Sequence, residues 1–198
     1  MEKTINIPCE NIELDGLFHH VSDKKAAVIS HPHPLYGGNM ENTVVEVITE
    51  ELIKNGYSTL RFNFRQVNTQ GSDNDSIKDL KAAMLFLEDK GFKNNILLAG
   101  YSYGSWVNST AISQGLIVSD SIMVSPPIAF MDYKNIKTPP GKGLVVTGTN
   151  DEIAPPELVQ EKVKEWHAAL KFETIKGCDH FYGGYFQELK KIISDYLK

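Results

Sequence analysis

Cysteine, basic charge and long apolar runs are all scarce in this sequence. Only two cysteines, Cys9 and Cys178, occur among its 198 residues, and they lie far apart in the chain. A disulfide framework is therefore not expected to hold the fold together, and reduced thiols in a cytoplasmic protein are the simpler interpretation. Cys178 precedes His180 by two residues, so a redox role for its thiol is conceivable. The alternative is that Cys178 is a small buried thiol that packs in the core.

The charge balance and the short apolar runs argue against two classes of partner. The formal net charge is −5, from 20 basic and 25 acidic residues, and no run of like charges occurs. A nucleic-acid partner usually requires a basic face, so none is expected. No apolar stretch approaches the ~20 residues that cross a bilayer, and residues 1–6 lack the apolar core of a secretory signal. We therefore expect no membrane partner, while the oligomeric state stays open.

Short apolar segments alternate with helix-length segments along the chain. This alternation predicts a mostly parallel sheet with helices on both faces, an α/β fold, within one domain that spans residues 1–198. The first two strands are expected to form an antiparallel edge. Strands are predicted at 3–8, 11–19, 26–30, 57–64, 95–100, 121–125, 144–148 and 170–175. Helices are predicted at 41–55, across Ile77, Leu80, Met84 and Leu87, at 103–114, from Pro155-Pro156, and from Phe181 onward.

The most informative segment is Gly100-Tyr101-Ser102-Tyr103-Gly104, between an apolar strand and a helix-compatible stretch. Gly-x-Ser-x-Gly arises by chance in many proteins, but in a strand–turn–helix context it is the signature of a nucleophile elbow. The turn forces its serine into strained backbone geometry, and the two glycines avoid collisions with the neighbouring strand and helix. We therefore predict that Ser102 is a catalytic nucleophile.

An acid and a histidine occupy the positions expected for the partners of such a serine. In this architecture the chain order is serine, acid, histidine, each on a loop after a strand. Asp151 follows the strand at 144–148, and His180 follows the last strand. We predict that His180 is the general base and that Asp151 orients it. Taken alone, Asp151 would be interpreted as a helix N-cap before Pro155, and His180 as a surface residue capping the last helix.

Three other carboxylates compete for the role of the acid. Asp132 is the main alternative, because its loop also opens at the carboxyl ends of the strands. Asp179 adjoins His180 and would rarely point toward the ring of its neighbour. Glu152 is adjacent to Asp151 and is expected to face water. Asp151 is therefore the favoured acid.

A serine nucleophile also requires backbone amides that stabilise the oxyanion of the intermediate. Tyr103 is predicted to supply one, because its amide begins the helix after the elbow. The second is expected from the loop at 31–39, where the two prolines have no amide to donate. His33, Leu35 and Tyr36 are the candidates there, and Leu35 is favoured.

Two histidine pairs invite a metal-site interpretation. His31 and His33 flank a proline, and His19 and His20 end the second predicted strand. Neither pair has a third ligand at a suitable spacing. We therefore expect no metal, a rigid substrate-facing loop around His33, and solvent-exposed side chains for His19 and His20.

Together these motifs resemble the α/β-hydrolase superfamily over essentially the whole chain. The two longest are His31-Pro32-His33-Pro34-Leu35-Tyr36-Gly37-Gly38-Asn39-Met40 with Asn42, and Leu60-Arg61-Phe62-Asn63-Phe64-Arg65. They are similar to a group of small bacterial hydrolases close to dienelactone hydrolases and to prolyl-oligopeptidase-like catalytic domains. The resemblance implies an α/β-hydrolase fold and a serine hydrolase with neither a metal nor an organic cofactor.

The sequence departs from this group in one loop. Where the group usually has Gly-x-Gly-x-Ser-x-Gly, this chain has Gln66-Val67-Asn68-Thr69-Gln70-Gly71-Ser72. The departure puts the substrate preference in question and leaves the three proposed catalytic residues unaffected. Dienelactone hydrolases often use a cysteine nucleophile, so Ser102 favours ester or amide chemistry over lactone opening.

The segment after the strand at 121–125 is too short for a lid. It has 17 residues, 126–142, which cannot form a helical cap, so we expect no lid domain and a shallow, open pocket. The substrate is expected to contact His33, Tyr36 and Trp106. Other side chains that could line the pocket, with ordinary packing as the alternative, are Tyr103, Phe130, Met131 and Tyr133.

The predicted function is a carboxylesterase that acts on short-chain esters of small soluble molecules. A peptidase, acyl-peptide hydrolase or thioester hydrolase is the enzyme alternative, although peptidases of the resembling group carry a gating domain, which we do not expect here. A catalytically silent fold used for binding is the alternative outside enzymes. The loss of a catalytic residue would signal it, and Ser102, Asp151 and His180 are all present.

Overall fold

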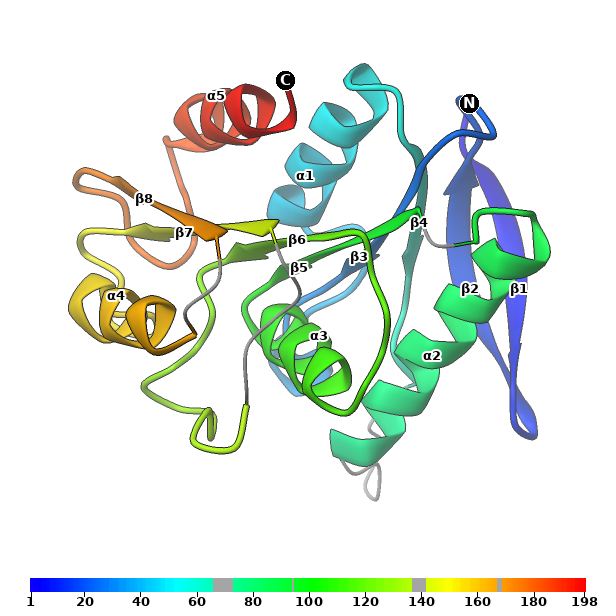
Figure 1. Ribbon diagram of the computed structural model, residues 1–198, viewed down its shortest axis with the longest axis horizontal. Coiled ribbons are helices and arrows are strands. Elements are labelled where there is room, and N and C mark those ends of the chain that lie inside the picture. Colours follow the sequence, from blue (N-terminus) through cyan, green and yellow to red (C-terminus); the bar gives the residue numbers. More distant parts are fainter. Residues whose placement is uncertain (66–72, 94, 137–141, 167–168) are drawn as a thin grey trace.

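The computed structural model describes residues 1–65, 73–93, 95–136, 142–166 and 169–198, and an eight-stranded sheet forms its centre (Figure 1). The strands lie in the order β1-β2-β4-β3-β5-β6-β7-β8. Their bounds are β1 Lys3–Cys9, β2 Ile12–His19, β3 Ala26–Ser30, β4 Ser58–Phe62, β5 Ile96–Tyr101, β6 Asp120–Val124, β7 Lys142–Gly148 and β8 Ala169–Ile175.

The sheet is mostly parallel with an antiparallel edge, as the sequence predicted. β1 pairs with β2 and β2 with β4 in antiparallel register, whereas all pairs from β4 to β8 are parallel. Strand order reverses around β3, which lies between β4 and β5. In open sheets of this kind, ligands bind outside the carboxyl ends of the strands at such a reversal.

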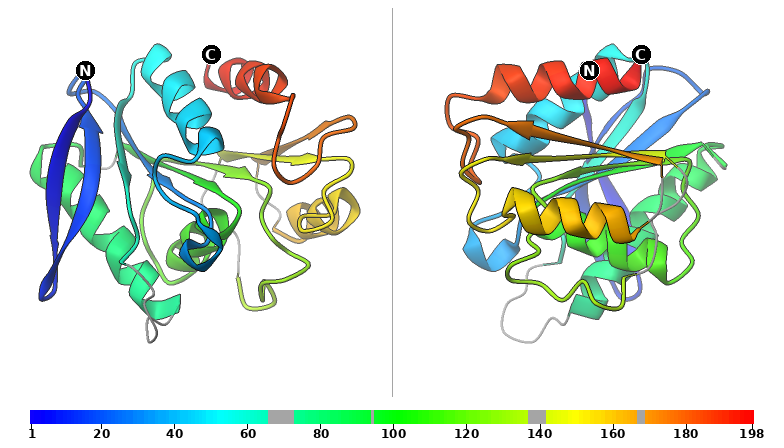
Figure 2. Two further views of the ribbon diagram at one scale, coloured as in Figure 1. Left: turned by 180° about the vertical axis from the view of Figure 1, so that it is seen from behind. Right: turned by 60° about the vertical axis from the view of Figure 1, so that its left-hand side comes forward.

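Helices cover both faces of the sheet (Figure 1), and Figure 2 shows the two layers from other directions. α1 (Thr43–Lys54) and α5 (Phe186–Leu197) pack together on one face. α2 (Asp73–Asp89), α3 (Tyr103–Ser113) and α4 (Pro156–Glu165) lie on the other. A short 3-10 helix, η1 (Pro34–Tyr36), follows β3.

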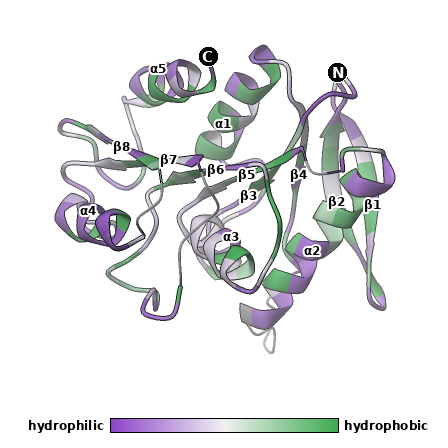
Figure 3. Cartoon of the chain, in the orientation of Figure 1, coloured by the Kyte–Doolittle hydropathy of each residue, from purple (hydrophilic) through white to green (hydrophobic). Residues whose placement is uncertain are grey.

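The helices form along segments with apolar periodicity, and α1 also has a capping side chain at its start. Asn42 caps α1, because its side-chain oxygen accepts a hydrogen bond from the amide of Val44. Hydrophilic and hydrophobic residues mix along the outer helices, as Figure 3 shows. The predicted apolar faces of α1 and α2 are buried: Val44, Val47, Ile48 and Leu52 in α1, and Ile77, Leu80, Met84 and Leu87 in α2.

The central strands are buried on both faces and therefore appear in the sequence as continuous apolar runs. Every residue of β3, β4 and β5 is buried. The core consists of two clusters, one on each side of the sheet. The helices on each face supply the outer half of each cluster, so the strand ends that carry the candidate site are held from both sides.

The closing helix begins later than the sequence predicted, at Phe186 and not at Phe181. Left-handed backbone at Tyr182 (φ 61°) and Gly184 (φ 83°) is incompatible with helix continuation there. Residues 177–185 instead form a loop, and this loop carries His180 over the carboxyl end of the sheet.

The connection from β6 to β7 contains no helix over its described part, residues 125–136. Within residues 125–136, no lid domain covers the strand ends, in agreement with the prediction. The atypical loop at 66–72 lies outside the described residues. Among the helices that the structure describes, none has both the length and the apolar composition that a membrane crossing needs.

Candidate active site

The candidate site lies where the carboxyl ends of five strands meet. Loops after β3, β5, β6, β7 and β8 contribute His33, Ser102, Ser125, Asp151 and His180, respectively. All five strands are parallel, so their carboxyl ends lie at one edge of the sheet. Side chains that are remote in the sequence are thereby brought together at this edge.

Ser102 occupies the sharp turn between β5 and α3. Its backbone has φ 52° and ψ −121°, a conformation that costs free energy for any residue with a side chain. The flanking glycines make the turn possible. A Cβ on Gly104 would lie 2.3 Å from the carbonyl oxygen of Ser30 in β3, and one on Gly100 would lie 2.6 Å from the backbone of α3 at Gly104 and Ser105. The collisions predicted from the sequence would therefore occur.

A continuous chain of hydrogen bonds joins a hydroxyl, an imidazole and a carboxylate. The Ser102 Oγ lies 2.9 Å from the Nε2 of His180. The Nδ1 of His180 lies 2.9 Å and 3.0 Å from the two carboxylate oxygens of Asp151. With Nδ1 protonated and bonded to the carboxylate, Nε2 is left as an acceptor for the serine proton. We refer to this arrangement as the Ser102–His180–Asp151 chain.

The surroundings of Asp151 favour its ionised form. Burial disfavours the charged carboxylate and would raise its pKa. Hydrogen bonds from His180, Ser125 and the Ala154 amide outweigh this effect, so the pKa of the Asp151 carboxyl lies below its ordinary value. The amides of Ile153 and Ala154 donate to Oδ1 at 3.0 and 2.7 Å. The helix-capping interpretation of Asp151 does not apply, because α4 begins after Pro155 without a side-chain cap.

The alternative acids are engaged or directed elsewhere. Asp132 is exposed, and its Oδ1 accepts from the amide of Lys134. The Oδ1 of Asp179 accepts from the amide of Phe181. Glu152 is exposed, as expected. Among the described residues, only Asp151 has a carboxylate within hydrogen-bond distance of the His180 ring.

His31 is a structural residue of the loop after β3. Its Nε2 accepts a hydrogen bond from the amide of Phe64, so Nδ1 carries the proton and donates to the carbonyl oxygen of Pro32. Burial lowers the pKa of His31 to about 4, which keeps the ring neutral. Neither ring nitrogen is left to bind a metal. Within the described part of the chain, no group of three His, Cys, Asp or Glu side chains is placed to hold one.

A cavity of about 760 Å³ opens beside Ser102 and His180. His33, Tyr36 and Tyr103, three of the predicted pocket residues, line it. Phe130 and Met131 from the loop after β6 also line it, as expected. The remaining lining residues are Pro32, Gly37, Gly38, Asn42, Tyr101, Pro127, Ile153 and Phe181.

Three other residues predicted near the substrate or the oxyanion lie away from the cavity wall. The amide of Leu35 donates to the Nδ1 of His33 at 3.2 Å, and its exposed side chain points to solvent. Trp106 is buried behind Tyr103, with the rings stacked 5.7 Å apart, and its Nε1 donates to the carbonyl of Asp132. Tyr133 is buried and packs on Trp166. A helical or loop position close to the serine in sequence does not by itself place a side chain on the cavity wall.

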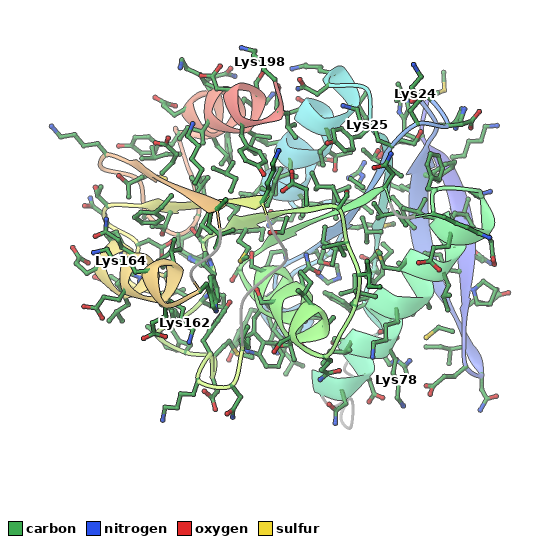
Figure 4. The ribbon with its side chains drawn as sticks, in the orientation of Figure 1. Lys24, Lys25, Lys78, Lys162, Lys164 and Lys198 are labelled. Atoms are coloured by element: carbon green, nitrogen blue, oxygen red, sulfur yellow. The ribbon has the colours of Figure 1, made fainter. Side chains whose placement is uncertain are left out.

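Over the described part of the chain, the cavity wall carries no fixed charge, because no Asp, Glu, Lys or Arg there lines it. In Figure 4, the labelled lysines Lys24, Lys78, Lys164 and Lys198 lie at the margin of the molecule, on outer helices and loops. Apolar rings are exposed at the cavity instead: Phe130 is 73% and Phe181 70% exposed. The arrangement suits an uncharged ligand with apolar groups.

Sequence reasoning missed three residues around the Ser102–His180–Asp151 chain. Tyr101 donates from its hydroxyl to the carbonyl oxygen of His180 at 2.8 Å. Ser125 donates to the Oδ2 of Asp151 at 2.6 Å, and Tyr182 lies 2.8 Å from Ser125. The one sequence signal that could have pointed to them is closeness to the predicted residues. Tyr101 adjoins Ser102, and Tyr182 follows His180 by two positions.

Comparison with known proteins gives one similar curated sequence. The chain is 33% identical over 185 residues to the uncharacterized protein RP471 of Rickettsia prowazekii (strain Madrid E), a match that covers 86% of this chain and 77% of that protein. No family model matches.

Solved structures give broader similarity. An alpha-beta serine hydrolase homologue from Coxiella burnetii is 28% identical with a TM-score of 0.89, and the match covers 99% of this chain and 97% of that one. XC6422 from Xanthomonas campestris, a serine hydrolase without a lid, is 25% identical with a TM-score of 0.86, and the match covers 99% and 93% of the two chains.

Proposed function

Because the chain belongs to the α/β-hydrolase superfamily, in the same family as the Rickettsia protein, we propose that it is a serine hydrolase that cleaves short-chain carboxylic esters. The observation that carries the proposal is the Ser102–His180–Asp151 chain at the carboxyl ends of β5, β7 and β8. Unactivated serine is a weak nucleophile, and a hydrogen-bonded imidazole that can take its proton makes attack on an ester carbonyl possible.

The proposed reaction has two halves. His180 takes the proton of Ser102 as the oxygen bonds to the ester carbonyl carbon, and then gives that proton to the departing alcohol as the ester bond breaks. An acyl group is left on Ser102. A water molecule, deprotonated by the same imidazole, then attacks this acyl-enzyme and releases the carboxylic acid and the free serine. Asp151 holds the ring and stabilises the imidazolium in both halves.

Backbone amides are proposed to stabilise the negative oxygen formed in each half. The amide of Tyr103 begins α3, where helix amides point toward an incoming negative charge. For the second donor we propose His33 in place of Leu35. His33 lines the cavity beside Ser102, whereas Leu35 does not, and the amide of Leu35 is bonded to the His33 ring.

The cavity supports an uncharged substrate of modest size. A volume of about 760 Å³, a wall whose described residues carry no fixed charge, and the exposed rings of Tyr36, Phe130 and Phe181 suit a small apolar ester. A long acyl chain would need a helical cover that shields it from water. The described part of the β6–β7 connection contains no such helix.

An activity screen tests this proposal. Purified protein is assayed with p-nitrophenyl acetate, butyrate and palmitate, with the matching thioesters, and with aminoacyl and Xaa-Pro amides. We expect the acetate and butyrate esters to be hydrolysed fastest and Ser102→Ala to lose on the order of 10⁴-fold or more in kcat. Ser119→Ala, an exposed serine remote from the cavity, serves as the control and should match wild type.

Covalent labelling separates a wrong substrate from a wrong function. A fluorophosphonate probe should label wild type and Ser119→Ala but not Ser102→Ala. Faster turnover of palmitate or of the amides would contradict the ester assignment and leave the serine hydrolase in place. Wild-type protein that neither reacts with the probe nor cleaves any substrate would instead favour a silent fold used for binding.

A further inference from the structure

The carboxylate of Asp151 is the start of a second, fully buried line of hydroxyl groups. Ser125 Oγ donates to Asp151 Oδ2 at 2.6 Å, and the Tyr182 hydroxyl lies 2.8 Å from Ser125 Oγ. Ser125 and Tyr182 are 0% exposed and Asp151 is 2% exposed. These three groups come from the loops after β6, β7 and β8, so the line ties together three separate segments.

The protons on this line can run in only one direction. An ionised carboxylate only accepts hydrogen bonds, so the single proton of the Ser125 hydroxyl is donated to Asp151. The Ser125 oxygen is then an acceptor, and the Tyr182 hydroxyl must be the donor to it. Burial raises the pKa of Tyr182, so this hydroxyl keeps its proton at neutral pH.

The backbone of both hydroxyl residues is strained. Among the described residues, four that are not glycine have positive φ: Glu10, Ser102, Ser125 and Tyr182. Three of these four belong to one hydrogen-bonded assembly with His180 and Asp151. Strained positions persist where the surrounding structure enforces them, and they concentrate at functional sites. Glycine would adopt φ 45° at position 125 without strain, but it would supply no hydroxyl.

From this geometry we infer that Ser125 and Tyr182 are positioning residues that fix the carboxylate of Asp151 for His180. This inference rests on the proposed function. The two backbone amides at 153 and 154 hold Oδ1, and the Tyr182–Ser125 line holds Oδ2. With both oxygens held, the carboxylate cannot rotate, and both stay within 3.0 Å of the His180 Nδ1. Among the described residues, the side chains of Ser125 and Tyr182 form no hydrogen bond to Ser102, so we expect their effect to pass through Asp151.

Single-atom deletions test this inference. Tyr182→Phe and Ser125→Ala remove one hydroxyl each and keep the ring or the Cβ. The protein provides matched controls, because the hydroxyls of Tyr133 and Ser121 are also buried but have no hydrogen-bond partner among the described residues. Tyr133→Phe and Ser121→Ala therefore delete the same groups without touching the line.

We expect Ser125→Ala to lower kcat for p-nitrophenyl butyrate by about 10- to 100-fold with KM within twofold of wild type, because a misplaced base costs rate and not binding. Tyr182→Phe should lower kcat by a smaller factor, since Ser125 can still donate. Both controls should retain wild-type kcat. Ser125→Gly, which removes the backbone strain along with the hydroxyl, should be as slow as Ser125→Ala. Wild-type kcat in Ser125→Ala, or equal losses in the controls, would overturn the inference.

A proton NMR measurement separates this inference from the proposed function. The low-field resonance of the His180 Nδ1 proton reports its bond to Asp151 and does not require turnover. We expect it to shift or broaden in Ser125→Ala and to stay unchanged in Ser121→Ala. If the wild type proved to be inactive but the resonance still responded in this way, the proposed function would fail and the positioning role would stand. An unchanged resonance in Ser125→Ala would refute the positioning role.

Discussion

The phenol hydroxyl of Tyr101 donates a 2.8 Å hydrogen bond to the backbone carbonyl oxygen of His180. Tyr101 is the last residue of β5 and directly precedes Ser102. Its ring also lies 5.5 Å from the imidazole of His180 and 6.1 Å from the ring of Tyr182. The strand end that carries the hydroxyl of Ser102 therefore also fixes the loop that carries the imidazole.

Loss of this hydrogen bond should reduce both stability and rate. Tyr101→Phe leaves a buried carbonyl at His180 without its donor, which should lower the free energy of unfolding by about 1–2 kcal/mol. The loosened loop should also lower kcat several-fold at unchanged KM. Urea unfolding and p-nitrophenyl butyrate kinetics measure the two effects. Tyr133→Phe is the control, and a Tyr101→Phe enzyme with wild-type rate and stability would show that the bond has no such role.

Gly104 should be intolerant of any side chain. A Cβ would lie 2.3 Å from the carbonyl oxygen and 2.5 Å from the carbonyl carbon of Ser30, so α3 would have to move away from β3. We expect Gly104→Ala to lower the free energy of unfolding by about 1–3 kcal/mol or more. At Gly183 a Cβ would meet nothing within 4 Å, so Gly183→Ala should change the free energy of unfolding by less than about 0.5 kcal/mol. Similar unfolding curves for the two variants would contradict the expected close contact.

Stability should fall in mild acid because of His31. Its folded-state pKa is about 4, below the ordinary value of 6.5. Between these values the unfolded chain binds a proton that the folded protein excludes, so the free energy of unfolding falls as pH falls. Lowering the pKa from 6.5 to about 4 corresponds to about 3 kcal/mol. The depressed pKa of Asp151 contributes separately, at pH values near and below 3.8.

Unfolding at a series of pH values from 7 to 4 measures this dependence. His31→Gln should be less stable at pH 7, because the amide of Phe64 loses its acceptor, but its stability should change less with pH. His20→Gln replaces an exposed histidine and should keep the wild-type slope. The same slope in His31→Gln as in wild type would assign the acid sensitivity to other groups.

The exposed rings at the cavity should determine the preference for acyl chain length. Phe181→Ala and Phe130→Ala should each lower kcat/KM for the butyrate ester by about fivefold, the equivalent of ~1 kcal/mol of lost apolar contact, with a smaller effect on acetate. Ile117 is 77% exposed and does not line the cavity, so Ile117→Ala is the control. Equal losses for acetate and butyrate would indicate that the rings do not contact the acyl chain.

Most of the fold follows from local sequence pattern. The buried strands and the apolar faces of α1 and α2 depend on residues within a few positions of one another, and the structure has them close to where the sequence predicted. The start of α5 was misplaced by five residues. Apolar periodicity continues back to Phe181, but the left-handed turn at Tyr182 is held by the buried surroundings of its side chain, which no local pattern reveals.

The sequence by itself determined which chemical groups are present and on which strand ends they lie, because residue type and hydrophobic period are local properties. The tertiary structure decided which of them meet. It brought Asp151, and not Asp132, to the imidazole of His180, turned the amide of Leu35 toward a side chain, and buried Trp106 behind Tyr103. Those outcomes depend on contacts between segments tens of residues apart, and such distances are set only when the whole sheet has formed.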